Sequence, residues 1–158
     1  TERVPAEALM KLNDLLAGRS RRGMFATLLY IELDAATGIM TLSNAGHLPP
    51  IIKKADGSLV KPATAGGAPL GMLPGMKLFQ EETTLGPGDT VVLYTDGIVE
   101  AMNAKEELYG FERFEALIKK SGPGPGALKD AIIADVNRFT GLSPQHDDMT
   151  LVCFGAVK

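Results

Sequence analysis

Two acid-bearing turns, far apart in the sequence, contain the residues best suited to chemistry. Asp96 follows the apolar run 90–93, and the pair Asp147 and Asp148 precedes the apolar run 151–154. In both places a carboxylate stands at one end of a β-type run, where a buried strand would meet solvent. Carboxylate oxygens are the ligands that Mg²⁺ and Mn²⁺ prefer. If the two strands are neighbours, the long intervening chain folds back and the acids share one metal-binding edge.

Each of these acids also has an ordinary structural interpretation. Asp-Gly, here Asp96 and Gly97, is common in turns, and the acids of the pair could simply cap the last strand. Adjacent carboxylates repel each other near a core unless a cation or hydrogen bonds compensate, so the pair is the sharper signal. Glu100, four residues after Asp96, is either a second acid near the metal or a capping, solvent-exposed side chain. Metal binding and capping both stay open on these residues alone.

A second polar motif, from Asn44 to His47, ends another predicted strand. His47 could serve as a general acid, a metal ligand or a phosphate contact. We favour the alternative that Asn44 and His47 hydrogen-bond the turn and hold its geometry. His146, beside the acid pair, either assists it or is a surface histidine. The glycine-rich loop 66–71 lacks the Gly-Lys-Ser/Thr ending of a nucleotide P-loop, which favours a surface flap.

The elements that must position these residues follow from hydrophobic periodicity. A helix is predicted from Pro5, with Gly18 as its terminator, and two further helical stripes occupy 111–118 and 128–139. The segment 121–126 between those stripes alternates Gly and Pro and is predicted to be non-helical. Strands are predicted at 24–33, which looks buried, and at 39–44, 51–55, 77–85, 90–94 and 150–157. Hairpin-linked strands with segregated helices predict an α+β fold in one domain, residues 1–158.

Composition excludes several classes of function. The 158 residues are 45% hydrophobic and 22% charged with a net charge of −3, and no long Lys/Arg cluster offers a surface to nucleic acid or anionic membranes. No apolar run reaches the ~20 residues that span a bilayer, and no signal peptide opens the chain. The chain has a single cysteine, Cys153, which excludes an internal disulfide and suits a cytoplasmic protein. We interpret Cys153 as a buried packing residue rather than a nucleophile.

Five motifs, taken in order, resemble a known family. They are 44–50 (Asn-Ala-Gly-His-Leu-Pro-Pro), 69–71 (Pro-Leu-Gly), 88–89 (Gly-Asp) leading to 94–101, 110–111 (Gly-Phe) and 147–152 (Asp-Asp-Met-Thr-Leu-Val). Together they closely resemble the SpoIIE/RsbU-type bacterial serine phosphatases, a branch of the metal-dependent protein phosphatases (PPM, type 2C). The resemblance runs from about Pro5 to the C-terminus.

The resemblance implies a fold, a cofactor and a reaction. The family fold is an antiparallel β-sandwich flanked by helices, with two Mn²⁺ or Mg²⁺ ions at one end. Metal-activated hydroxide attacks phosphoserine or phosphothreonine directly, and the suspected substrate is a phosphorylated anti-sigma-factor antagonist in bacterial signalling. Asp96 and Asp147 correspond to metal-binding catalytic acids, and Asp148 looks more like an outer neighbour of the metal site. Supporting roles are expected for four further positions: Gly97, Asn44, His47 and Glu100.

One departure from the family pattern matters. Complete members open with a Gly-Asp…Gly-His-Gly segment that supplies a bridging aspartate, and nothing here resembles it. We therefore expect the parent protein to be a phosphatase, and this chain alone to bind metal weakly and to be inactive or severely impaired. Uncovered strand edges would favour self-association, such as a homodimer. The alternatives are a degenerate phosphatase-like module that binds proteins or itself, and a carboxylate–metal module acting on small phosphate esters.

Overall fold

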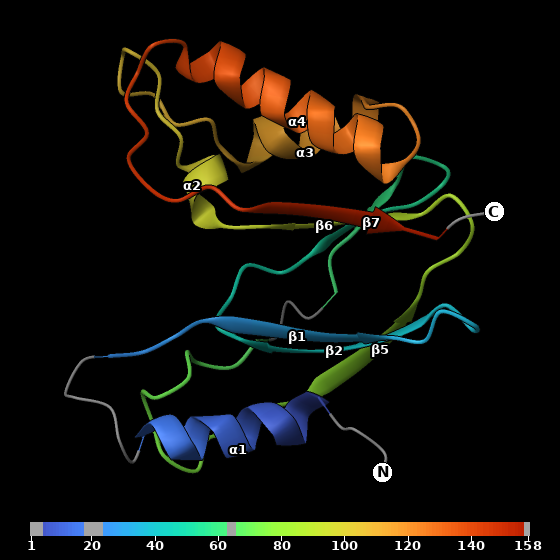
Figure 1. The fold of residues 1–158 in the computed structure, drawn as a ribbon, viewed down its shortest axis with the longest axis vertical. Helices are drawn as coiled ribbons and strands as arrows, with labels where there is room; N and C mark the ends of the chain where they lie inside the picture. The colour runs from blue at the N-terminus through green and yellow to red at the C-terminus, as the bar shows by residue number, and fades with distance from the viewer. Residues whose placement is uncertain (1–4, 18–23, 63–65, 157–158) are drawn as a thin grey trace. The chain divides into compact units, whose positions relative to one another are not determined.

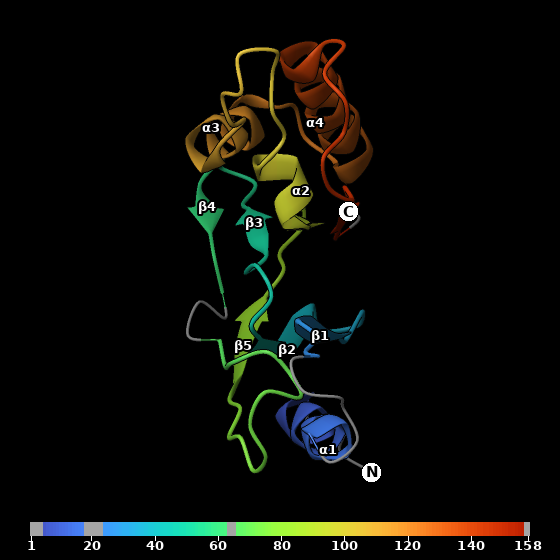
Figure 2. The same cartoon turned by 90° about the vertical axis from the view of Figure 1, so that its left-hand side faces the viewer.

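The computed structural model describes residues 5–17, 24–62 and 66–156 (Figures 1 and 2). The chain divides into two compact units, of which unit 1 comprises Thr1–Pro49 with Lys61–Leu85, and unit 2 comprises Pro50–Val60 with Gly86–Lys158. Each unit has its own antiparallel sheet, with one described helix in unit 1 and three in unit 2, so each is described by itself. The expectation of one phosphatase-like domain over residues 1–158 stays a prediction.

Unit 1 packs one helix on a three-stranded sheet. The sheet has the order β1 (Leu28–Leu33), β2 (Ile39–Ala45), β5 (Gln80–Thr84), and both pairings are antiparallel. The helix α1 (Pro5–Ala17) begins at the proline that the sequence analysis placed first, and it lies along this sheet (Figure 1). Leu9 of α1 is buried in a cluster that includes residues of β2 and of the loop before β5. The predicted terminator, Gly18, lies outside the described residues.

The most buried polar side chain of α1 is Asn13, a position that hydrophobic periodicity does not mark. Its amide nitrogen donates to the Leu73 carbonyl at 2.9 Å, and its amide oxygen accepts from the Gly71 N–H at 3.0 Å. The Gly67 N–H donates to the Asn44 carbonyl at 2.8 Å. Two N–H groups of the glycine-rich loop are thus used inside unit 1, which argues against a phosphate cradle there.

The first predicted strand is shorter and less buried than expected. We predicted a buried strand over 24–33, but β1 begins at Leu28, and only an isolated bridge joins Ala26 to Leu70 before it. Met24 and Phe25 are exposed and β1 is only half-buried. Among the described strands, β1 pairs with β2 alone. Unit 1 therefore does not fully cover the apolar side chains of β1.

Unit 2 contains the strands that carry the acid turns. Its sheet has the order β4 (Leu59–Val60), β3 (Ile51–Lys53), β6 (Thr90–Tyr94), β7 (Leu151–Gly155), with every pairing antiparallel. The strands β6 and β7 are neighbours, since Tyr94 pairs with Leu151 and Thr90 with Gly155, which meets the condition for the acid turns to share one edge. A turn that contains Asp56 and Gly57 joins the antiparallel strands β3 and β4.

Two helices cover one face of this sheet. They are α3 (Phe111–Lys120) and α4 (Pro125–Thr140), which lie beside each other (Figures 1 and 2). The Phe114 ring of α3 packs against the Tyr94 ring of β6, with the ring centres 4.7 Å apart and the ring planes tilted by 58°. The predicted helical stripes supply the buried side chains, which are Phe114, Ile118, Leu128, Ile132 and Val136. These sheets and helices confirm the α+β class.

Several boundaries in unit 2 differ from the sequence-based expectation. The strands predicted over 51–55 and 150–157 are shorter, at Ile51–Lys53 and Leu151–Gly155. The segment 121–126 was expected to be non-helical throughout, but α4 begins at Pro125, because proline is tolerated in the first turn of a helix. The turn at Asp96 is a short helix, α2 (Asp96–Val99). No helix within the described ranges combines the length and apolar character needed to cross a bilayer.

The Gly88-Asp89 motif has a structural role in unit 2. The buried Asp89 carboxylate accepts N–H groups from Gly86 at 2.8 Å and Ala55 at 2.9 Å, and it pairs with the Lys54 ammonium. Burial opposes ionisation of Asp89, but these hydrogen bonds outweigh it and hold the pKa below its ordinary value. The motif therefore fastens the turn before β6 to the β3–β4 hairpin.

Candidate functional site

The pairing of β6 with β7 brings the two acid turns to the same edge of the sheet of unit 2. Beyond the last strand pair, the Thr95 N–H donates to the Thr150 carbonyl at 3.1 Å. The Thr95 hydroxyl donates to the Asp148 carbonyl and accepts from the Thr150 N–H, each at 2.9 Å. Thr95 was not singled out from the sequence, although its hydroxyl joins the two turns.

Gly97 allows the turns to approach closely. A Cβ atom at this position would lie 2.5 Å from the Asp148 carbonyl oxygen and 3.3 Å from that of Asp147. The first distance is shorter than van der Waals contact allows, so any side chain here would push the turns apart. The glycine of the Asp-Gly pair is therefore needed for tertiary packing as well as for the turn.

The three carboxylates lie exposed on this edge. Asp96 accepts a hydrogen bond from the Gly97 N–H at 3.1 Å, and Asp147 accepts one from the Asp148 N–H at 2.7 Å. The Gln145 amide donates to the Asp147 carbonyl at 2.7 Å, which steadies the loop before β7. The backbone thus positions the acids, and no cationic side chain is recorded in a salt bridge with them among the described residues.

The donor chemistry suits a hard divalent cation only in part. Carboxylate oxygens are appropriate ligands for Mg²⁺ or Mn²⁺. Within the described ranges, however, no three His, Cys, Asp or Glu side chains gather closely enough to hold a metal ion. Asp96, Asp147 and Asp148 therefore supply at most part of a ligand set, and their metal roles stay predictions.

A pocket opens beside the acid turns, wholly within unit 2. Its volume is about 400 Å³, and its walls come from α2, the C-terminal half of α4 and the loop before β7. Two carboxylates, Glu100 and Asp147, belong to the lining, which contains no lysine or arginine. Polar groups come from Asn137, Thr140, Ser143, Gln145 and His146, and apolar surface comes from Ala101, Met102, Val136 and Met149.

One wall of this pocket is a stiff hairpin after α2. The Tyr109 N–H donates to the Ala101 carbonyl at 2.8 Å, and Met102 forms a bridge with Leu108. At the tip, the Asn103 side chain accepts the N–H groups of Lys105 at 2.9 Å and Glu107 at 3.1 Å. These bonds hold Ala101 and Met102 in place as pocket lining.

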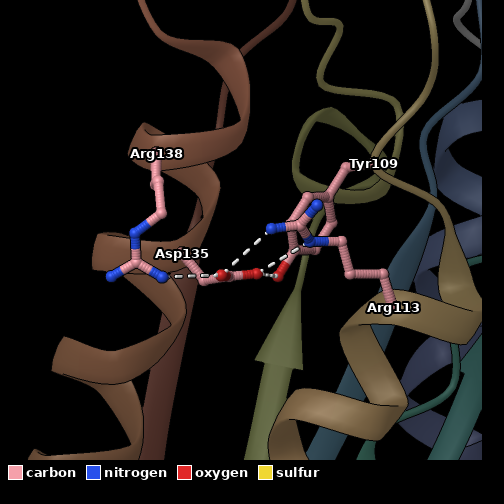
Figure 3. A network of polar contacts seen from close by, with 4 residues as sticks. All are labelled: Tyr109, Arg113, Asp135 and Arg138. Carbon is pink, nitrogen blue, oxygen red and sulfur yellow. Dashed lines mark hydrogen bonds and ion pairs between the residues drawn. The ribbon is translucent and has the colours of Figure 1, made fainter.

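A polar cluster fastens this hairpin to α4 (Figure 3). The Asp135 carboxylate accepts the Tyr109 hydroxyl at 2.8 Å and a two-pronged contact from Arg113 at 2.9 and 3.1 Å. Arg138 approaches Asp135 from the same helix at 3.3 Å. The Arg113 guanidinium also lies over the Tyr109 ring at 5.1 Å and the Phe139 ring at 4.8 Å. This arrangement, called the Asp135 cluster below, joins the two walls of the pocket.

The Asp135 cluster shifts the ionisation of its members. The hydrogen bonds from Arg113 lower the pKa of Asp135, and those from Tyr109 act in the same direction. Burial raises the pKa of the Tyr109 phenol, and its bond to Asp135 raises it further. The cluster therefore contains a carboxylate and a neutral phenol throughout the neutral range. Sequence reasoning missed it, because partners that lie 26 positions apart leave no local pattern.

Asn44 and His47 belong to unit 1, where they build a turn. The Asn44 side chain accepts the His47 N–H at 2.8 Å and donates to the His47 carbonyl at 2.9 Å. Gly46 has φ +75°, and a Cβ there would lie 2.8 Å from Pro69. The His47 ring contacts the Thr27 hydroxyl at 3.2 Å. These contacts agree with the turn-holding role favoured from the sequence, and a supporting role in chemistry stays a prediction.

Cys153 is the single cysteine of the chain. It lies half-buried on β7, and burial raises the pKa of its thiol to about 11. A protonated thiol is a weak nucleophile at neutral pH. The interpretation of Cys153 as packing rather than catalysis is therefore consistent with its surroundings.

Known proteins resemble this chain along nearly its whole length. The family model for Stage II sporulation protein E (SpoIIE) matches residues 1–156. Protein IcfG of Synechocystis sp. (strain ATCC 27184 / PCC 6803 / Kazusa) is 27% identical over 146 residues, which make up 92% of this chain and 23% of that protein.

Solved structures share the fold. The SiaA-PP2C domain of Pseudomonas aeruginosa has a TM-score of 0.79 at 20% identity, covering 97% of this chain and 61% of that one. The phosphatase domain of the cell fate determinant SpoIIE from Bacillus subtilis, presoaked with Mn, has a TM-score of 0.70 at 23% identity, covering 96% of this chain and 65% of that one. The chain thus spans less than two thirds of each protein named here.

Proposed function

This chain belongs to the SpoIIE family of PP2C-type phosphatase domains, and from that premise we propose that it carries part of a metal-dependent protein serine/threonine phosphatase site. The observation that carries the proposal is the shared edge of β6 and β7. There Thr95 and Gly97 lock the Asp96 turn against the Asp147–Asp148 turn. These contacts fix the spacing of the two acid-bearing turns before any cation binds.

The residues that would hold metal are Asp96 and Asp147, with Asp148 as a neighbouring acid. Divalent cations bound there would activate water and neutralise charge on the phosphoryl group. The Bacillus subtilis SpoIIE phosphatase domain was presoaked with Mn, which supports this choice of cofactor. What the chain itself contributes is the fixed spacing of the two turns and, through Gly97, their close approach.

We place the activity in the complete protein that contains residues 1–158. Because no three metal-ligating side chains gather among its described residues, we expect this chain to bind metal weakly by itself. The family resemblance supports a phosphoserine or phosphothreonine protein as substrate, an anti-sigma-factor antagonist above all, in cytoplasmic bacterial signalling.

The test compares single substitutions in the complete protein. Phosphate release from a phosphoserine protein is measured with and without Mn²⁺, and Mn²⁺ binding is measured separately by calorimetry. Asp96→Asn and Asp147→Asn should each reduce both signals at least tenfold, whereas Asp148→Asn should reduce them less. Asp130→Asn, an exposed acid on α4 outside the pocket lining, is the matched control. Full Mn²⁺ binding and phosphate release in Asp96→Asn would remove Asp96 from the site.

A second candidate function is a degenerate module that binds protein partners or a second copy of itself. The lack of a three-donor group among the described residues favours it. It predicts a complete protein that releases no phosphate with Mn²⁺ yet forms a defined complex or homodimer in analytical ultracentrifugation. Mn²⁺-dependent phosphate release would decide for the enzyme.

A further inference from the structure

We propose that the pocket beside the acid turns is a subsite for a lysine or arginine side chain of the substrate, close to the phosphorylated residue. This inference rests on the proposed phosphatase function and assigns the pocket a selective role within it. The charge of the lining, its apolar surface, its position and its fixed walls all support this role.

The charge of the lining favours a cation. Glu100 and Asp147 are its carboxylates, and no lysine or arginine faces them from any wall. With Asp147 assigned to metal, Glu100 is the pocket carboxylate that remains for a ligand. A phosphate or an acidic side chain would meet like charge here, so the pocket itself does not suit the phosphoryl group.

The remaining lining suits a long, amphipathic side chain. Met102, Val136 and Met149 offer apolar surface for the methylene stem of lysine or arginine. Asn137, Thr140 and Gln145 offer oxygen acceptors for the donors of the head group. The pocket volume of about 400 Å³ is much larger than a methyl group. It has room for a long side chain and for a water molecule that bridges the side chain to the lining.

The position of the pocket links it to the reaction. Gly97 and Asp147 belong both to the pocket lining and to the acid turns, so the pocket begins where the phosphoryl group would be bound. An extended peptide advances about 3.3–3.6 Å per residue. A side chain within about three positions of the phosphoserine therefore reaches the pocket.

The pocket is also pre-organised. The Asp135 cluster ties the Ala101–Met102 wall to α4, which carries Val136 and Asn137 on the facing wall. A pocket whose walls are already fixed does not need to order them when a side chain enters, and this favours selective binding.

The experiment uses the complete protein that contains this chain, together with Mn²⁺ and phosphoserine peptides. Arginine, lysine, norleucine or glutamate is placed in turn at each of the three positions on either side of the phosphoserine. At one position the KM for the arginine or lysine peptide should be about fivefold below that of the norleucine peptide, a modest factor because Glu100 is exposed. The glutamate peptide should have the highest KM.

Variants assign the preference to Glu100. Glu100→Gln should remove most of the difference between the arginine and norleucine peptides, and Glu100→Lys should reverse the preference toward glutamate. Glu112→Gln, an exposed acid on α3 that does not line the pocket, is the matched control and should retain the arginine preference. Thermal melts of all variants confirm that each is folded.

A binding measurement separates this inference from the proposed activity. Fluorescence anisotropy of the same peptides without phosphate, on metal-free protein, reports the charge preference even when no phosphate is released. A preference that depends on Glu100 without phosphate release supports the subsite and counts against the proposed catalysis. Phosphate release with no charge preference, or with a preference that survives Glu100→Gln, overturns the subsite.

Discussion

Asp135→Asn is the substitution that most directly tests how unit 2 is held together. Asp135 accepts four hydrogen bonds from three residues, and its side chain is only 14% exposed. The asparagine keeps the size of the side chain but loses its charge, so it offers the arginine donors a weaker partner. The Tyr109 hydroxyl, on a residue that is 3% exposed, then competes for the one remaining carbonyl oxygen.

The expected loss follows from these contacts. Weakening the bond to a buried hydroxyl costs about 1–2 kcal/mol, and the Arg113 ion pair, which is 41% exposed on the arginine side, adds about 0.5–1 kcal/mol. We expect a loss of about 2 kcal/mol in the free energy of unfolding. For a chain of this size that loss lowers the Tm by about 4–8 °C.

The assay is urea unfolding followed by circular dichroism, with Arg138→Ala as the matched control. Arg138 contacts the same carboxylate, but its side chain is 75% exposed, so its removal should cost at most about 0.5 kcal/mol. A loss below about 0.5 kcal/mol in Asp135→Asn, or equal losses in the two variants, would contradict the role given to the Asp135 cluster.

The pH dependence gives a second criterion. The hydrogen bonds from Arg113 lower the pKa of Asp135 in the folded state, so its stabilisation is present in full above the unfolded pKa of about 4. That stabilisation is lost as the pH falls through the folded pKa, and the difference between wild type and Asp135→Asn should close there. A difference that is unchanged in strong acid would refute the electrostatic explanation.

Two further predictions concern the β6–β7 edge. Gly97→Ala should lower Mn²⁺ affinity and phosphate release of the complete protein at least tenfold, because its Cβ would lie 2.5 Å from the Asp148 carbonyl oxygen. The control is Gly126→Ala, whose Cβ would have no neighbour within 4 Å. Unchanged Mn²⁺ binding in Gly97→Ala would contradict the close packing. The Cys153 thiol, whose pKa is raised by burial to about 11, should react with iodoacetamide more than tenfold slower in folded than in urea-unfolded protein at pH 8, as measured by mass spectrometry, and equal rates would contradict its burial.

The sequence predicted the elements with strong local signals. The run 90–94 is bounded by turn residues on both sides, and β6 has those limits, while the stripe of apolar residues at helical spacing located α3 and α4. The sequence located the two acid turns at the ends of β-type runs, and the pairing of β6 with β7, which no local pattern specifies, brings the turns to one edge. Boundaries with weaker signals moved: β1 lost its first residues, which have no strand partner beyond one bridge at Ala26.

What escaped prediction depends on contacts between distant residues. Asn13, Thr95 and Asp135 are polar residues whose partners lie far along the chain, so no spacing rule identifies them. The sequence shows Gly97 as half of an Asp-Gly turn. The reason that only glycine fits there is the Asp148 carbonyl, which faces Gly97 in the folded chain. The metal roles of Asp96 and Asp147 rest on the family, because their immediate surroundings gather too few donors.

The pairing of β6 with β7 also has a consequence for the order of events during synthesis. Asp96 leaves the ribosome well before Asp147, and nothing local holds the first turn near the second until β7 has paired along Tyr94 to Thr90. The acid edge is therefore a late product of folding, formed by a contact between distant parts of the chain, which is intrinsically slow. A nascent chain interrupted before Leu151 would contain every helix of unit 2 and still lack the edge on which the proposed chemistry depends.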